Sequence, residues 1–380
     1  MPQPIPSCMR RLWSHWNRHR VVKCRLRSRV GAVGCLMLDY LVIFGRFQPP
    51  HREHSRVIEQ GLKCARQLIV LFGAVDLPRS IQHPWTFDER VEMLESTLAP
   101  DASERICMLP APDNLYRSQR WAKAMSAIVA AQVAADGRAM SAVRIGSLGT
   151  GFDVRAQARQ GLSAWPGVNI KPPTNNYGTD VRAQVFQVAA GGEAQLEQWL
   201  SAAVLPALRA TLDTAWFAEL QAEFAANDQF REAWRHAPWP PIHVTVDAIV
   251  IVQEQVLLVQ RARHPGKGLW ALPGGFLDSH ETLVAACIRE LYEETHIEIE
   301  RSVLSASMRL NEVFDNPVRS ARGRTITHAY LFDLGDIHLA PSVTGGDDAR
   351  LARWFPFERV QRGQLFEDHY AILQAMIGLE

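Results

Sequence analysis

Six residues at fixed intervals between Gly275 and Glu294 constrain this chain more than any other feature of its sequence. They follow the spacing G-x5-E-x7-R-E-U-x-E-E, in which U is aliphatic: Gly275, Glu281, Arg289, Glu290, Glu293 and Glu294, with Leu291 at U. Residues 283–295 have helix-forming composition, and a helix turns about 100° per residue, so the last three glutamates share an arc of about 100°. Val284, Ile288 and Leu291 fall on a neighbouring arc, which predicts the buried side of this helix.

Three carboxylates on one arc are unfavourable without a cation. A solvated helix face usually mixes charges, whereas like charges at this spacing repel one another. Carboxylate oxygens prefer hard cations such as Mg²⁺ or Mn²⁺. We therefore expect Glu290, Glu293 and Glu294 to bind a divalent cation, with Gly274 and Gly275 forming a tight loop before the helix.

This spacing is the Nudix box, and residues 242–380 resemble the Nudix hydrolases. The resemblance implies an α/β/α sandwich with a mixed sheet and a Mg²⁺-dependent (or Mn²⁺-dependent) hydrolase that holds a diphosphate. It implies a catalytic set of Glu281, Arg289 and the three cation-binding glutamates, in which Arg289 orients a glutamate through a bidentate pair. The family's glycine after the glutamate pair is His296 here, where we expect the helix to end in a left-handed turn.

The substrate prediction comes from the segments that follow the helix. Phe314-Asp-Asn-Pro317, Arg319, Arg322, Arg324, Gly345-Gly346, Trp354 and Phe366-Glu-Asp-His369 resemble the ADP-ribose pyrophosphatases that are fused to nicotinamide-nucleotide adenylyltransferases. The resemblance implies hydrolysis of ADP-ribose to AMP and ribose 5-phosphate. A group formed by Arg319, Arg322 and Arg324 suits a second phosphate and a ribose. The alternative interpretation is that these arginines lie on a solvated strand edge and bind no substrate. The general base stays open among Glu293, Glu312 and Glu367.

The preceding residues, 37–190, predict a Rossmann-like α/β domain. Strands expected at 40–44, 67–72 and 142–145 alternate with helices at 57–66, 85–98 and 118–135, and this alternation favours a parallel sheet. Residues 193–235 read as a long helical stretch that ends at Ala237-Pro-Trp-Pro-Pro241. We therefore assign residues 191–241 as a helical linker.

The motif that carries chemistry in this first domain follows its first strand. Gly45-Arg-Phe-Gln-Pro-Pro-His51-Arg-Glu-His54 resembles the HxGH motif of nicotinamide-nucleotide adenylyltransferases. The resemblance implies that Gly45, Arg46, His51 and His54 contact ATP phosphates, aided by the positive end of the next helix. It also implies that Trp85 stacks on the nicotinamide ring and that Thr179 and Arg182 serve the triphosphate.

Three departures from that motif indicate a partly degenerate adenylyltransferase. Glu53 replaces a glycine and places negative charge beside the triphosphate, the serine of the second triphosphate motif is missing before Thr179, and Ser147 stands where the family has histidine after glycine. A Nudix hydrolase of other nucleoside diphosphate derivatives with a catalytically dead first domain is one alternative, and a non-catalytic ADP-ribose sensor is another.

Charge and cysteine usage limit the partners. Residues 1–36 hold seven Arg, one Lys and no acidic residue, which leaves 33 basic residues against 40 acidic ones and a net charge of about −7 in the rest. We therefore expect small nucleotides as partners (ADP-ribose, nicotinamide mononucleotide and ATP), no nucleic acid, no membrane and a homo-oligomer as an option. Six dispersed cysteines favour the cytoplasm.

The basic extension, residues 1–36, receives no function. We expect it to be disordered or a gene-model artefact with translation starting at Met37. A transit peptide or an RNA-binding arm is the alternative.

Overall fold

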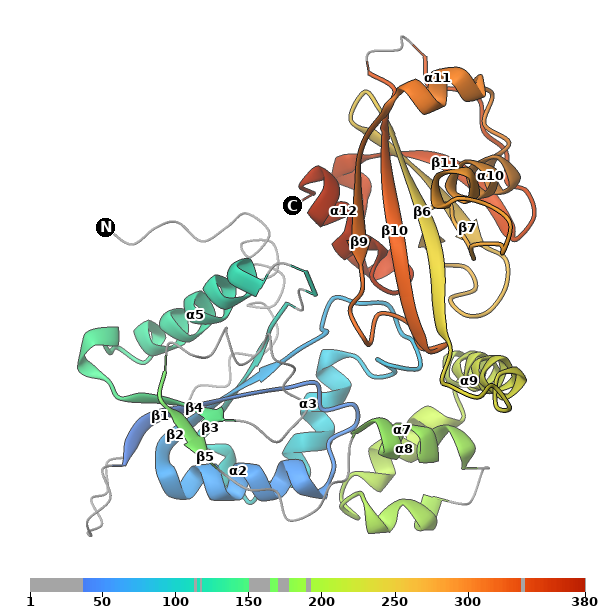
Figure 1. Ribbon diagram of the computed structural model, residues 1–380. Helices are drawn as coiled ribbons and strands as arrows, with labels where there is room; N and C mark the ends of the chain where they lie inside the picture. Colours follow the sequence, from blue (N-terminus) through green and yellow to red (C-terminus); the bar gives the residue numbers. More distant parts are fainter. Residues whose placement is uncertain are drawn as a thin grey trace. The chain divides into compact units, whose positions relative to one another are not determined.

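The computed structural model describes residues 37–112, 115–116, 118–149, 165–169, 178–188, 193–335 and 339–379. It divides into two compact units, which Figure 1 draws in sequence colours: Met1–Val75 with His83–Phe217, and Asp76–Gln82 with Ala218–Glu380. The predictions for residues 1–36 lie outside the described residues, and the domain limits at 190 and 241 stay predictions. No helix in the described residues is long and apolar enough to cross a bilayer.

The first unit is built on a five-stranded parallel sheet with the strand order β3-β2-β1-β4-β5. Its strands are β1 (Leu38–Gly45), β2 (Ala65–Phe72), β3 (Ile106–Pro110), β4 (Ile145–Gly149) and β5 (Gly167–Asn169). Its helices are α2 (Arg52–Cys64), α3 (Phe87–Glu95), α4 (Pro100–Ser103), α5 (Ser118–Ala135), α7 (Gly178–Gln187) and α8 (Leu205–Leu212). The predicted parallel sheet is therefore confirmed.

Helices cover both faces of this sheet because the central strands are apolar on both sides. In β1, Leu41 and Ile43 share one core with α2 and α3, while Tyr40 and Val42 share the other with α5. A strand whose residues alternate between two buried faces has to be apolar throughout, as parallel sheets usually require. The carboxyl ends of the strands, where ligands of such folds bind, are then left to loops.

Element limits differ from the sequence expectation where local signals were weak. The helix expected from 57 begins at Arg52, directly after His51, and the strand expected at 142–145 begins at Ile145. The long helical stretch 193–235 is broken into a 3₁₀ segment (Glu193–Gln198), α8 and α9 (Ala215–Ala233). Pro206 lies in the first turn of α8, where a missing N–H costs least.

The second unit contains a six-stranded mixed sheet with the order β11-β7-β6-β10-β9, and β8 pairs with β7. Its strands are β6 (Ile242–Val252), β7 (Gln255–Arg261), β8 (Trp270–Ala271), β9 (Met308–Phe314), β10 (Arg324–Asp333) and β11 (Ala349–Pro356). Its helices are the later part of α9, α10 (Leu283–Thr295), α11 (Arg301–Ala306) and α12 (His369–Ile377). Only β6 and β10 run parallel; the predicted mixed sheet is confirmed.

Strand β6 separates the apolar core of this unit from its polar side. Val246 and Ala248 pack against α10 in the hydrophobic core. Asp247, between them, points to the other face, where His369 at the start of α12 lies 3.9 Å away. Figure 1 shows α10 and α12 on opposite faces of the sheet. This alternation places the acidic helix and a buried polar network on either side of one strand.

The first unit offers a direct test of a buried ion pair. Asp39 in β1 is 8% exposed and accepts hydrogen bonds from Arg138 Nη2 and the Arg144 backbone N–H, each at 2.9 Å. Burial alone raises the pKa of Asp39, but these two hydrogen bonds outweigh it, so the pKa lies below its ordinary value of 3.8. A carboxylate whose pKa is lower in the folded state than in the unfolded state stabilises the fold at pH values above its unfolded-state pKa. This stabilisation is lost as the pH falls through the folded-state pKa.

We expect Asp39→Asn to lower the free energy of unfolding by about 2 kcal/mol at pH 7, since hydrogen bonds to charged groups contribute on this scale. The difference from the wild type should shrink as the pH falls below about 4. Urea unfolding followed by circular dichroism at several pH values measures both effects. Asp101→Asn, at an exposed position, is the control; an Asp39→Asn effect that is the same at pH 7 and pH 3 contradicts the assignment.

Candidate active sites

The loop before α10 can be built only with glycine. Gly274 has φ +158°, and a Cβ there would lie 2.1 Å from the carbonyl oxygen of Val246. A Cβ on Gly275 would lie 2.5 Å from Oε1 of Glu290. The Val246 N–H donates to the Gly275 carbonyl at 2.9 Å, so the loop runs alongside β6. The two glycines therefore let the backbone approach both the sheet and the acidic helix.

Arg289 gathers the carboxylates of the acidic helix α10. Its Nε and Nη2 donate to the two oxygens of Glu281 at 3.0 and 2.6 Å, which is a bidentate pair. Its Nη1 donates to Glu290 at 2.8 Å and to Glu293 at 2.9 Å. One guanidinium thus fixes three of the predicted catalytic carboxylates. The helix ends at His296 in the left-handed conformation, φ 43°, where a glycine was expected to be easier to accommodate.

Burial makes a negative charge on Glu290 or Glu294 costly. Burial raises the pKa of Glu294 to about 8, against the lowering effect of the Gly274 N–H at 3.0 Å, and the nearby Glu290 adds to the rise. Burial also raises the pKa of Glu290, although Arg289 opposes it. Two interacting carboxylates in this state are stabilised as anions by an added cation.

The three predicted metal ligands do not form a ready-made cluster. Among the described residues, no three His, Cys, Asp or Glu side chains are arranged to hold a metal ion. The physical reason is that Arg289 takes one oxygen each of Glu290 and Glu293, while Glu294 accepts from the Gly274 N–H. Their chemistry still fits a hard divalent cation, because oxygen donors and unrelieved mutual repulsion are what such a cation needs.

The three arginines expected at a second phosphate have different surroundings. Arg319 is 5% exposed and forms a bidentate pair with Asp368 at 2.9 and 3.0 Å. A guanidinium held by a buried carboxylate has fewer donors left for a phosphate, and the expected phosphate role of Arg319 stays a prediction. Arg324 bonds to the backbone and carboxylate of Asp315. Arg322 is half-buried, and its Cζ lies 5.0 Å from the centre of the Phe276 ring.

Arg261 completes the basic side of the site and was missed in the sequence. It ends β7, its Nε donates to the Pro265 carbonyl at 2.7 Å, and its Cζ lies 4.3 Å from the centre of the Phe366 ring. Burial and then the like charge of Arg322 lower its pKa, while Glu294 opposes this. The only signal in the sequence was an arginine at the end of an apolar strand, and no fixed spacing linked this arginine to α10.

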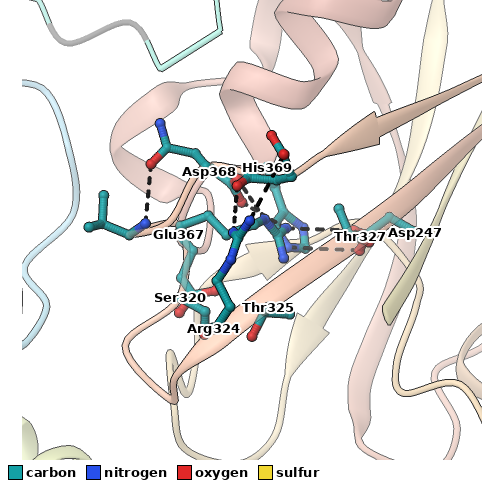
Figure 2. A network of polar contacts seen from close by, with 12 residues as sticks. Asp247, Ser320, Arg324, Thr325, Thr327, Glu367, Asp368 and His369 are labelled. Atoms are coloured by element: carbon teal, nitrogen blue, oxygen red, sulfur yellow. Dashed lines mark hydrogen bonds and ion pairs between the residues drawn. The ribbon is translucent and has the colours of Figure 1, made fainter. Parts of the chain in front are cut away.

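Asp247 was also missed, and it anchors a buried polar network that Figure 2 shows from close by. The Thr327 hydroxyl donates to Asp247 at 2.6 Å, and the Leu272 N–H donates to Nδ1 of His369 at 2.8 Å. Burial lowers the pKa of His369 to about 3, so this imidazole is neutral at pH 7 and its Nε2 carries the proton. The network fixes the start of α12, and with it Glu367.

The three general-base candidates are spread over the unit. Glu293 is half exposed on α10 beside Arg289. Glu312 is exposed on β9, the edge strand. Glu367 has φ 43°, accepts from the Ala321 N–H at 3.1 Å, and its pKa is raised by burial against the pull of Arg322.

In the first unit, two side chains tie together the loops at the carboxyl ends of β1 and β2. The Gln48 amide exchanges two hydrogen bonds with the Trp85 backbone, at 2.8 and 3.0 Å. Arg90, fully buried, donates to the carbonyls of Arg46 and Gly73. These contacts hold Gly45 and Arg46 at the strand end and explain why the segment needs Gln48 and Arg90.

His51 and His54 stand together at the amino end of α2. Their rings are 3.6 Å apart, and the His51 N–H donates to Nδ1 of His54 at 3.2 Å. Burial, followed by the charge of Arg182, lowers the pKa of His51 to about 4. Arg182 donates to the Gln48 carbonyl at 3.0 Å and to the Thr179 hydroxyl at 3.2 Å. The structure therefore brings four predicted residues to one helix amino end, where anions bind readily.

Two other expectations for this unit concern Trp85 and Glu53. Trp85 is 2% exposed and its indole N–H donates to Thr211 at 3.4 Å, so its ring is buried in this structure. Its stacking on a nicotinamide ring stays a prediction. Glu53 is buried, and its carboxylate forms an ion pair with Arg56 at 3.3 Å. Arg56 therefore offsets part of the negative charge that was expected beside the triphosphate.

Comparison with known proteins assigns a domain family to a part of each unit. The NUDIX domain model matches residues 241–376 and the Cytidylyltransferase-like model matches residues 42–122. A bifunctional NMN adenylyltransferase/ADP ribose pyrophosphatase from Francisella tularensis, solved with AMP and a Mn ion, is 30% identical with a TM-score of 0.81, over 90% of this chain and 99% of that one.

Two curated relatives match one unit each. An ADP-ribose pyrophosphatase of Methanocaldococcus jannaschii is 32% identical over 34% of this chain and 70% of its own length. A nicotinamide/nicotinic acid mononucleotide adenylyltransferase of Acinetobacter baylyi is 32% identical over 24% of this chain and 48% of its own length. Because the Francisella likeness extends over both units, the chain belongs to the family of bifunctional NMN adenylyltransferase/ADP-ribose pyrophosphatases.

Proposed function

We propose that the second unit hydrolyses ADP-ribose to AMP and ribose 5-phosphate with Mg²⁺ or Mn²⁺. The observation that carries this proposal is the pairing of a buried acidic side, Glu290 and Glu294, with a basic side, Arg261 and Arg322. A diphosphate is the ligand that satisfies both, because its oxygens bind cations and guanidinium groups alike. Water then adds across the bridging phosphoanhydride P–O bond, which releases two monophosphates.

Each residue has a separate task in this reaction. When bound, the divalent cation would neutralise the diphosphate and activate water. Arg289 holds Glu281, Glu290 and Glu293 in one arrangement, which keeps the carboxylates close together before substrate enters. Arg261 and Arg322 attract the second phosphate. We assign Glu293 as the proton acceptor, since it lies on the acidic helix itself and half of it is open to water.

The glutamates of α10 are the first point to test. We expect Glu290→Gln and Glu294→Gln each to lower kcat for AMP release at least 100-fold, because each removes a charge that the cation needs. Glu298→Gln, at an exposed position just beyond the helix, should match the wild type. If the wild type binds ADP-ribose in a calorimeter with Mg²⁺ present but releases no AMP, the unit is a sensor and the hydrolase proposal is wrong.

Metal removal gives a second test. Protein treated with EDTA and desalted should release no AMP from ADP-ribose, and Mg²⁺ or Mn²⁺ should restore the reaction while Ca²⁺ does so poorly, since its longer bonds suit the compact site less well. Malachite-green detection of phosphate after phosphatase treatment follows the products. Full turnover in EDTA contradicts the role given to the acidic helix.

For the first unit we propose formation of NAD⁺ and pyrophosphate from ATP and nicotinamide mononucleotide, at a rate reduced by Glu53. The clustering of His51, His54, Thr179 and Arg182 at the amino end of α2 supports binding of the triphosphate. The neutral imidazoles can donate to phosphate oxygens without a charge of their own. Glu53 works against the same anion, although Arg56 offsets part of its charge.

Removing the Glu53 charge should therefore help this reaction. We expect Glu53→Gln to lower the KM for ATP about 3-fold to 10-fold with little change in kcat, because two like charges near 4 Å repel by about 1 kcal/mol even in bulk water. Glu59→Gln, on the exposed side of α2, is the matched control. Enzymatic cycling of NAD⁺ measures the rate. Absence of NAD⁺ from the wild type and from both variants, with ADP-ribose hydrolysis intact, would show that the first unit is inactive.

Two broader features of the proposal follow the same chemistry. Both substrates are small nucleotides, and we place the protein in the cytoplasm, where they are made and degraded. A homo-oligomer remains compatible with this scheme.

A further inference from the structure

Four aromatic rings form one cluster beside the diphosphate loop of the second unit. Phe230 and Trp234 come from the end of α9 and the residue after it, His243 from β6 and Phe276 from the loop that follows Gly275; we call them the aromatic patch. Phe230 stacks on Phe276 with ring centres 5.9 Å apart, and His243 lies 5.1 to 5.8 Å from the other three rings.

The aromatic patch begins one residue after the glycine that lies against the acidic helix α10. Gly275 lies against the Glu290 carboxylate, and Phe276 is the next residue. Phe276 bridges Thr245 of β6, so its side chain lies on the same face as His243 and Asp247. Four residues of strand separate His243 from Asp247, which is about 13 Å at 3.3 Å per residue. The patch and Asp247 therefore occupy two ends of one sheet face, and α10 packs on the other face.

Part of this aromatic surface stays open to solvent. Trp234 is 46% exposed and Phe276 is 37% exposed, whereas His243 beneath them is 9% exposed. Arg322 lies over Phe276, with Cζ 5.0 Å from the ring centre. Exposed aromatic rings beside a planar guanidinium are the groups on which proteins stack nucleobases.

The end of α9 is fixed to the same loop by a polar contact. Arg231 Nη1 donates to the Ala321 carbonyl at 3.0 Å, and Ala321 directly precedes Arg322. The Ala321 N–H in turn donates to Glu367 at 3.1 Å. The end of α9, which Trp234 directly follows, is thus joined to the loop that carries Arg322, and the indole of Trp234 packs edge-on against His243.

We propose that the aromatic patch holds the adenine ring of the substrate, which stacks on the exposed indole of Trp234. This inference rests on the proposed hydrolase function and gives it a base specificity. The AMP half of the substrate lies toward α9, and the ribose 5-phosphate half lies beyond the diphosphate. The end of the expected linker is then a working part of the hydrolase site.

Trp234→Ala in the full-length protein tests this. We expect the KM for ADP-ribose to rise about 10-fold or more, as loss of one base-stacking ring usually does, with kcat within about 2-fold. The inhibition constant of AMP should rise by the same factor, and that of ribose 5-phosphate should not change. Trp234→Phe should restore most of the affinity, because it keeps an aromatic face. Trp239→Ala, at a position 81% exposed, is the matched control.

The possible results separate this inference from the function on which it rests. A KM and an AMP inhibition constant within 2-fold of the wild type overturn the stacking role. Equal weakening of AMP and ribose 5-phosphate also overturns it, because it shows that Trp234 only supports the fold. If the wild type does not hydrolyse ADP-ribose, the proposed function fails. Calorimetry of AMP with the wild type and Trp234→Ala then still decides the stacking role without turnover, because only the second unit differs.

Discussion

The contact on which the hydrolase half depends is the clamp of Arg289 on Glu281, Glu290 and Glu293. Carboxylates crowded on one helix face repel one another, and burial of Glu290 and Glu294 adds a desolvation cost. Arg289 offsets part of this, because its hydrogen bonds lower the pKa of Glu281 and oppose the rise in the pKa of Glu290. The repulsion and the desolvation cost around Glu294 remain uncompensated, and a divalent cation bound there would offset them.

The same principle of incomplete compensation applies to the opposite side of the site. Arg319 forms a bidentate pair with Asp368, whereas Arg261 is destabilised as a cation by burial and by the like charge of Arg322. Arg319 and Arg322, only three residues apart in the sequence, thus have different surroundings. The deciding factor is whether a buried acid reaches the guanidinium, and only packing around Asp247 and α12 determines that.

The first unit relies on backbone geometry more than on charge. Gln48 and Arg90 bind carbonyl and amide groups of neighbouring loops, which fixes the chain after β1 so that His51 caps α2. The histidines are neutral through burial, and the positive character comes from Arg182 and the helix end. Glu53 is tolerated because Arg56, one turn away, pairs with it.

Patterns with a strict period or spacing determined a large part of this structure from the sequence. The α10 helix, its glutamate arc and the parallel sheet follow from side-chain periodicity, and the mixed sheet follows from the resemblance to the Nudix hydrolases. The early start of α2 and the breaks at α8 and α9 did not follow, because loop contacts outweigh helix propensity there.

Tertiary structure alone decided which polar residues meet. Arg261 and Asp247 contact Phe366 and Thr327, which lie about 80 to 105 residues further along the chain, and the aromatic patch joins α9 to β6 and to a loop, so no local pattern could join them. The burial of Trp85 did not follow from the sequence for the same reason, since it depends on α8 far along the chain. The sequence determined the residues that crowd charge on one helix; the fold determined the residues that surround the substrate, because burial and proximity arise only when distant segments pack together.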